Sequence, residues 1–252
     1  MLLSGRKLTR MKHILPLTLF IFSGIFAGAQ SNYDDLLELI VDKKYERCLY
    51  KAMKYTEEEK TTKDPLPYLY VSMAYFKIDQ SEDETLKAKY DNKAFKESLK
   101  YAVKYRKKDK ESLYYAEFAE FFSELREKTM VQAEQEMGEE KYTRSKGTYK
   151  YLCDIDANDV GAWIMKGYSE YMLKSKKDAT LSWDEAKKIV SEGRAEGLRD
   201  EQLRLFKKGV ITLAEMFDAE GSRSEAEAWL EIGKPFFENE KDFMVTYRTI
   251  VG

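Results

Sequence analysis

The sequence predicts an all-α fold, specifically a right-handed α-solenoid of about five stacked helical hairpins. Three observations lead to this prediction. The chain has only four prolines in 252 residues and is rich in Ala, Glu, Lys and Leu, residues that favour helices. No stretch shows the alternation of apolar and polar residues, bounded by turn residues, that indicates paired strands. One pattern of helical spacing also recurs along the chain.

The recurring pattern places four residues at intervals of 3, 4 and 3, so that they share one face of a helix. It occurs five times, and its second member is always a small residue. These small residues lie 40–50 positions apart and are Cys48, Ser98, Ser145, Ala186 and Ala226. Because an isolated hairpin cannot bury its apolar face, neighbouring hairpins are expected to stack on one another.

The expected elements follow in order along the chain. The first helices of the hairpins are expected at roughly 33–41, 66–77, 111–137, 160–173 and 201–217, and the second helices at about 43–55, 82–108, 142–152, 183–193 and 222–233. Because 82–108 and 111–137 are unusually long, they are expected to form an enlarged hairpin in the middle of the solenoid. Ser81, Ser182 and Ser222 each precede a Glu by three residues, the spacing of a capping box. The segment "FMVTYRTIV" predicts a closing helix.

The succession of helix, turn and helix is clearest in "KYTRSKGTYKYLCDIDANDVGAWIMKGYSEY". The Asp-rich turn "DIDAND" ends the helix expected at 142–152, because Asp and Asn compete for backbone hydrogen bonds. On the next helix Trp163, Gly167 and Tyr171 are spaced by 4 and 4. The missing side chain of Gly167 is expected to let another helix approach closely.

These motifs resemble the tetratricopeptide repeat. "DPLPYLYVSMAYFKI" matches the first-helix motif through Tyr68, Val71, Ser72 and Tyr75, "AWIMKGYSEY" matches it through Trp163 and Gly167, and "LFKKGVITL" matches it through Gly209. The resemblance covers most of residues 33–239, with longer repeats than the family's period of about 34 residues. It implies that first helices line a concave groove for a partner segment. The groove residues it implies are Leu69, Met73, Phe76, Ile164, Tyr168, Tyr171, Phe206, Val210 and Leu213.

The stretch "YYAEFAEFF" places aromatic residues at helical spacing and leaves two interpretations open. The first is core packing inside the long hairpin. The second is an exposed aromatic surface for a partner, since large apolar patches on soluble proteins usually indicate interaction sites. Tyr115 lies on a different side of this helix and is the better candidate for exposure, so it joins the expected partner-binding residues.

Residues 1–29 have the features of a secretory signal peptide. They contain four basic residues and no acid, followed by an apolar run and the small residues Ala27, Gly28 and Ala29 before Gln30. Cleavage is expected near Ala29-Gln30, leaving 30–252 as one helical-repeat domain in the periplasm or cell envelope. A retained N-terminal anchor is the alternative, and translation could start at Met1 or Met11.

Charge and composition argue against several functions. The chain has 43 Lys+Arg and 45 Asp+Glu; loss of the four basic residues in 1–29 leaves 39 against 45, a net charge of −6. An acidic chain opposes general binding to nucleic acid, which depends on neutralising phosphates. The single histidine, His13, would leave with the signal peptide. No nucleophile motif, phosphate-binding loop or metal-ligand cluster is present, so we expect no enzyme, no catalytic residue, no cofactor and no metal.

Two further features have structural interpretations. Cys48 and Cys153 are expected to be buried free thiols, with an internal disulfide as the alternative in an exported chain. The basic run "KYRKKDK" (104–110) is expected to stabilise a helix C-terminus. Its alternative role is contact with an acidic protein or a lipid headgroup.

Together these observations predict an exported protein–protein interaction scaffold. The expected context is an accessory subunit of a bacterial cell-envelope, secretion or outer-membrane assembly, with possible peripheral association with a membrane complex. The partner would be another protein, bound in the solenoid groove without turnover. Two alternatives remain: a helical module that binds cell-wall material or carbohydrate, and a self-assembling structural protein.

Overall fold

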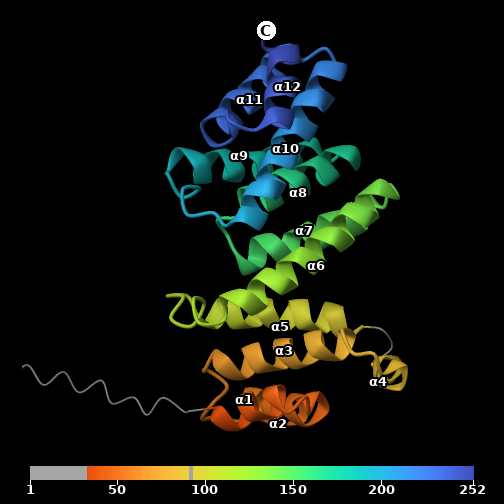
Figure 1. The fold of residues 1–252 in the computed structure, drawn as a ribbon, viewed down its shortest axis with the longest axis vertical. Coiled ribbons are helices and arrows are strands. Elements are labelled where there is room, and N and C mark those ends of the chain that lie inside the picture. Colours follow the sequence, from red (N-terminus) through yellow and green to blue (C-terminus); the bar gives the residue numbers. More distant parts are fainter. Residues whose placement is uncertain (1–32, 91–92) are drawn as a thin grey trace, which may run out of the picture. The chain divides into compact units, whose positions relative to one another are not determined.

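The computed structural model of the chain describes residues 33–90 and 93–252, and every regular element in these ranges is an α-helix (Figure 1). The all-α prediction is therefore confirmed for the described residues. The expected signal peptide, residues 1–29, lies outside them. The helices are α1 (Asp34–Val41), α2 (Tyr45–Glu57), α3 (Leu66–Asp79), α4 (Glu84–Lys89), α5 (Ala94–Lys108), α6 (Ala119–Gly138), α7 (Tyr142–Ile155), α8 (Val160–Met172), α9 (Lys176–Ser191), α10 (Asp200–Ala219), α11 (Arg223–Phe237) and α12 (Lys241–Ile250).

Helices close in sequence pack on one another. α2 packs on α1 and α3, α3 on α5, α6 on α7, α8 on α9, and α10 on α11. Contacts also link helices of successive pairs. α5 packs on α7, α7 on α8, and α8 on α10. The final helix, α12, covers both α10 and α11, which confirms the helix expected over "FMVTYRTIV".

The small positions of the recurring pattern are all in the interior. Cys48, Ser98, Ser145, Ala186 and Ala226 are each fully buried. Two of them also form polar contacts with a neighbouring helix. The backbone carbonyl of Ser98 accepts a 2.8 Å hydrogen bond from the Ser72 hydroxyl, and the Ser145 and Ser169 hydroxyls lie 2.9 Å apart. The pattern therefore identified correctly the face on which these helices pack.

Gly167 also has the expected role. A Cβ on Gly167 would lie 2.4 Å from Nε1 of Trp183, on α9. The indole nitrogen of Trp183 donates a 3.2 Å hydrogen bond to the carbonyl of Ile164. Because Gly167 has no side chain, the Trp183 ring of α9 packs directly against the backbone of α8.

The two long central helices are predicted wrongly. In place of one helix over 82–108 the structure has α4 and α5, and α4 ends at Lys89 with Tyr90 as its C-cap residue. The Tyr90 hydroxyl donates a 3.0 Å hydrogen bond to Glu46 of α2, and its ring lies edge-on to Tyr75 of α3 at 5.9 Å. These tertiary contacts hold the end of α4 against α2 and α3, so the single helix expected over 82–108 is divided into α4 and α5.

The helix expected from residue 111 begins only at Ala119. The cause is Asp109, a buried carboxylate at the end of α5. It accepts backbone N–H groups from Leu113 and Tyr114 at 2.8 and 3.3 Å, and the hydroxyl of Tyr105 at 2.5 Å. These bonds organise residues 110–118 as a turn around the carboxylate. With α6 packed on α7, the expected enlarged hairpin of α5 and α6 is not formed.

The expected capping boxes are also wrong. Asp83, and not Ser81, caps α4, because its carboxylate accepts the N–H groups of Thr85 and Leu86. Ser182 lies inside α9, where its hydroxyl donates to Glu170 at 2.6 Å. Ser222 precedes α11 without a side-chain cap. The Ser-x-x-Glu spacing located the start of α11, where Ser222 is the N-cap residue, but not the starts of α4 and α9.

The described core has two hydrophobic clusters that meet along α6. Phe121, Phe122 and Leu125 belong to the cluster formed with α1–α5, whereas Met130 and Ala133 belong to the cluster formed with α7–α12. Between these two sets of α6 residues lie the buried side chains of Arg126 and Thr129. A single helix therefore supplies apolar side chains to both clusters.

Candidate functional site

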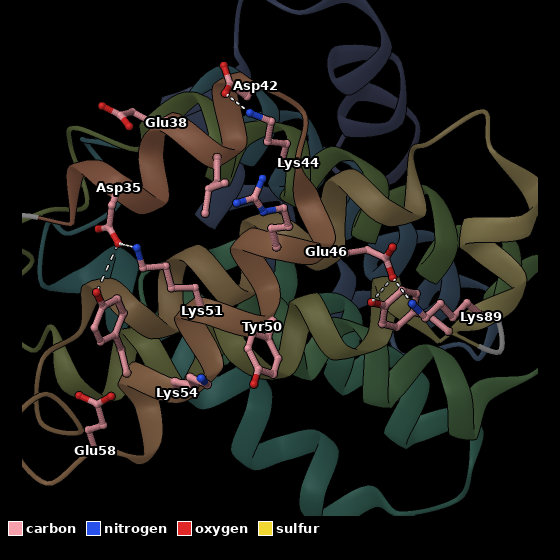
Figure 2. A pocket seen from close by; sticks show the side chains of 14 residues that line it. Asp35, Glu38, Asp42, Lys44, Glu46, Tyr50, Lys51, Lys54, Glu58 and Lys89 are labelled. Carbon is pink, nitrogen blue, oxygen red and sulfur yellow. Dashed lines mark hydrogen bonds and ion pairs between the residues drawn. The ribbon is translucent and has the colours of Figure 1, made fainter.

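An open groove of about 920 Å³ lies along α1 and α2 and reaches the end of α4 (Figure 2). The two helices are joined by the short turn at 42–44, in which Lys43 adopts a positive φ of 57°. Leu36 of α1 and Cys48, Leu49 and Ala52 of α2 face the core. The opposite faces of both helices are left to line the groove.

Ion pairs tie the walls of the groove together. Asp35 of α1 pairs with Lys51 of α2 and also accepts a 3.3 Å hydrogen bond from the hydroxyl of Tyr55. Glu46 of α2 pairs with Lys89 of α4 at 2.6 Å (Figure 2). The hydrogen bond from Lys89 lowers the pKa of the Glu46 carboxyl, and the hydrogen bond to Asp35 raises the pKa of Lys51. These exposed pairs keep their charges and connect three helices around the groove.

The outer face of α2 presents a second group of side chains, Arg47, Tyr50 and Lys54. Tyr50 is 68% exposed. The Lys54 ammonium lies 4.6 Å from the centre of the Tyr50 ring. Within the described residues neither Arg47 nor Lys54 forms an ion pair, so their charges are open to a ligand.

The site therefore combines ion pairs between its helices with an exposed aromatic ring and cations that form no ion pair. Two carboxylates of the groove, Glu38 and Glu58, also lack an ion-pair partner in the part of the chain that the structure describes. Such an arrangement can bind a segment that carries charges of both signs and an apolar side chain. It offers ligand contacts along two helices in a wide, solvent-open channel.

Seven of the ten residues expected to line a partner groove lie in the core. They are Leu69, Met73, Phe76, Ile164, Phe206, Val210 and Leu213, and all are less than 9% exposed. They lie on α3, α8 and α10, and the faces that carry them pack against neighbouring helices. As a result, the seven side chains contact other parts of the chain and do not form an open surface.

The other three expected residues are partly exposed, yet each already has partners. The Tyr171 hydroxyl donates a 2.7 Å hydrogen bond to Glu220, and Tyr168 packs against the second cluster. Tyr115 stacks on Phe122 with 4.6 Å between ring centres, and its hydroxyl accepts a 3.1 Å hydrogen bond from Arg199. Tyr115 is thus a packed residue. In "YYAEFAEFF" Phe121 and Phe122 belong to the core.

The groove of α1 and α2 was not found from the sequence. A signal for it was present, because Arg47, Tyr50 and Lys54 are spaced by 3 and 4 on one helical face. That face is opposite the apolar one, so Tyr50 is an aromatic residue on the polar side of an amphipathic helix. An aromatic in that position is a better guide to a surface site than an aromatic on the packed face.

Two other predicted features can be compared with the structure. Cys48 and Cys153 are both buried and free, and burial raises the pKa of the Cys48 thiol to about 12. In the basic run, Arg106 donates to the carbonyl of Ile155 at 2.8 Å and Lys108 to that of Thr62 at 2.6 Å. These cations at the end of α5 thus contact carbonyls of other segments, and the expected stabilisation of the helix C-terminus stays a prediction.

Comparison with protein-family models gives no match, and comparison with curated proteins gives none either. The resemblance to the tetratricopeptide repeat therefore stays a prediction. Within the described ranges, no helix is both long and apolar enough to cross a membrane. The same ranges contain no group of three or more His, Cys, Asp or Glu side chains placed to hold a metal ion.

Proposed function

We propose that the protein is an exported interaction scaffold that binds a segment of another protein in the groove of α1 and α2. The observation on which this proposal rests is the exposed Tyr50 between Arg47 and Lys54, beside a frame of ion pairs. Aromatic and arginine side chains are enriched where proteins bind one another. The function is recognition of a polypeptide without chemical turnover.

Exposed apolar side chains occur in the hairpin that carries the groove, and one of them, Tyr50, lines the groove itself. Among the described residues eight large hydrophobic side chains are exposed, and three of them belong to the first hairpin. These three are Leu37, Val41 and Tyr50. An end hairpin of a repeat array normally presents a polar outer face to water. Apolar side chains at this end favour a surface that another molecule covers.

We further propose that α1–α12 form a right-handed α-solenoid of tetratricopeptide-like hairpins. The packing of successive helix pairs and the five buried small residues, 40–50 positions apart, support it. Together with the signal-like residues 1–29, it favours a bacterial periplasm or cell envelope. There the chain would act as an accessory subunit of an envelope, secretion or outer-membrane assembly.

Cross-linking mass spectrometry on cells that express the tagged full-length chain, after envelope fractionation, tests this function. Lys51, Lys54 and Lys89 line the groove, whereas Lys177 and Lys241 lie outside it. We expect repeated cross-links from the groove lysines to one envelope protein. Cross-links only between copies of the chain would instead support self-assembly, and recovery with purified cell-wall material alone would support a carbohydrate-binding module.

A further inference from the structure

A second cleft, separate from the groove of α1 and α2, lies between α5, α6 and α7. Its volume is about 800 Å³. α6 and α7 pack on each other, and α5 packs on α7, so the cleft follows the line along which α5 faces the pair. Side chains from all three helices line it.

The floor of this cleft is apolar. Phe95 and Leu99 of α5 are buried beneath it, and Tyr151 of α7 is half-buried at its side. The cleft is large enough to receive several side chains, since pockets of 300–1,000 Å³ hold whole small ligands. An apolar floor favours a ligand that brings hydrophobic groups of its own.

The rim of the cleft is basic. Four Lys or Arg side chains and two carboxylates line it. Both carboxylates are already occupied, because Asp154 pairs with Lys150 at 2.5 Å and Glu136 accepts hydrogen bonds from Gln132 and Thr148 at 2.9 and 2.7 Å. Lys96 and Arg144, by contrast, are exposed and form no ion pair within the described residues. The charge of the cleft is therefore complementary to a negatively charged ligand.

Gly147 leaves open space at the side of the cleft. It lies inside α7, where glycine lowers helix stability relative to alanine. Gly161, Gly167, Gly209 and Gly233 lie inside helices where an added Cβ would come within about 3 Å of a neighbour, so close packing explains each of them. At Gly147 an added Cβ would meet nothing within 4 Å. The open space over this glycine faces the cleft.

We propose that this cleft docks an acidic segment of a partner polypeptide, laid along α7 over Gly147. Carboxylates of the segment pair with Lys96 and Arg144, and its apolar side chains contact Phe95, Leu99 and Tyr151. Arg144 offers a planar guanidinium that can hold a carboxylate through two parallel hydrogen bonds. This surface goes beyond the proposed groove site and shares no residue with it.

Binding of two designed peptides to the purified chain tests the proposal. The probes are a fluorescein-labelled 12-residue peptide of Glu-Glu-Leu-Phe repeats and its counterpart with Lys in place of Glu, followed by fluorescence anisotropy. We expect saturable binding of the acidic peptide only. The variant K96E/R144E should weaken it at least about tenfold, through loss of two charge-assisted contacts. K177E/K241E, which makes the same charge change outside the cleft, should bind like the parent.

A second variant separates binding from folding. Gly147→Leu fills the space over α7 while adding a better helix former. It should weaken the acidic peptide at least about tenfold with an unchanged or higher melting temperature. A Tyr50→Ala variant of the groove of α1 and α2 should leave this peptide's affinity unchanged. A failure of this proposal can therefore be told apart from a failure of the proposed function.

Three results would overturn the proposal. They are absence of saturable binding of the acidic peptide, equal binding of both peptides, and acidic-peptide binding that K96E/R144E and Gly147→Leu leave intact. Sedimentation velocity of the protein alone provides a further check. A dimer that is lost in K96E/R144E but kept in K177E/K241E would assign the cleft to a second copy of the chain and reject a different partner.

Discussion

Asp159 caps the N-terminus of α8 and, through its other oxygen, accepts a 2.5 Å hydrogen bond from Arg126 of α6. Arg126 and Asp159 are 5% and 1% exposed, so the ion pair is buried. Arg126 also donates to the carbonyl of Glu201 at 3.4 Å. Near the point where the two hydrophobic clusters meet, one guanidinium therefore links α6, α8 and α10.

The first prediction concerns this pair. Removing one partner leaves the other charge buried without compensation, so Arg126→Met or Asp159→Ala should each lower the free energy of unfolding by about 3–5 kcal/mol. The double variant should lose less than the sum of the two. Urea unfolding in a double-mutant cycle measures the coupling, and the exposed pair of Glu127 and Arg204 is the control. Arg204→Met should change stability by less than about 1 kcal/mol. Additive losses at Arg126 and Asp159 would refute the coupling.

A second prediction compares two buried tyrosines. Burial raises the pKa of both Tyr105 and Tyr149. The Tyr105 hydroxyl donates to Asp109, whereas the Tyr149 hydroxyl has no hydrogen-bond partner among the described residues. A buried polar group without a partner costs stability, so Tyr149→Phe should raise the free energy of unfolding by about 1 kcal/mol, while Tyr105→Phe should lower it by about 2 kcal/mol. Equal losses in thermal or urea unfolding would show that Tyr149 is hydrogen-bonded.

A third prediction concerns pH. Because burial holds the pKa of the Cys48 thiol at about 12, the folded protein keeps its proton where the unfolded chain, with a thiol pKa near 8.5, loses it. The unfolded state is then favoured as pH rises. Above pH 8.5 this thiol should reduce stability by about 1.4 kcal/mol per pH unit. Between pH 7.5 and 9.5 the parent should therefore lose more stability than Cys48→Ala. If the free energy of unfolding fell equally with pH in both proteins, burial would not be raising the pKa of the Cys48 thiol.

A fourth prediction contrasts two glycines of neighbouring helices. A Cβ on Gly161 of α8 would lie 2.5 Å from the backbone nitrogen of Phe206 and 2.6 Å from the carbonyl carbon of Leu205. Because backbone atoms cannot move aside cheaply, Gly161→Ala should lower the free energy of unfolding by about 1–3 kcal/mol. Gly147→Ala, with open space at its Cβ, should raise it by about 1 kcal/mol. If Gly161→Ala left the free energy of unfolding unchanged, α8 and α10 would be packed less closely than the distances at Gly161 indicate.

These contacts show what the sequence could predict. The buried small residues Cys48, Ser98, Ser145, Ala186 and Ala226 were found because helical periodicity is a local property. The breaks before α5 and α6 were not found, because they depend on Glu46 and Tyr75 holding Tyr90, and on the burial of Asp109. The bond from Tyr90 to Glu46 joins residues 44 positions apart, which no local pattern relates. The bonds of Asp109 are local in sequence, but its burial depends on the packing of other parts of the chain.

The candidate sites were harder to predict for a similar reason. Residues such as Leu69 and Val210 were assigned to a groove from the repeat pattern, yet neighbouring helices cover the faces that carry them. The periodicity that locates a helix face does not say whether another helix covers it. Tyr50 and Gly147 could be chosen from the sequence only by asking which residues are out of place on a polar helix face.

The most direct test of the scaffold function is photo-cross-linking from position 50. A benzophenone amino acid replaces Tyr50 in one variant and Leu181 in another, since Leu181 of α9 is also well exposed, at 59%, but lies outside the groove. After irradiation of intact cells, we expect one adduct with a distinct envelope protein from position 50 and none from position 181. Equal adducts from both positions, or no adduct with another protein from position 50, would contradict binding in the groove of α1 and α2.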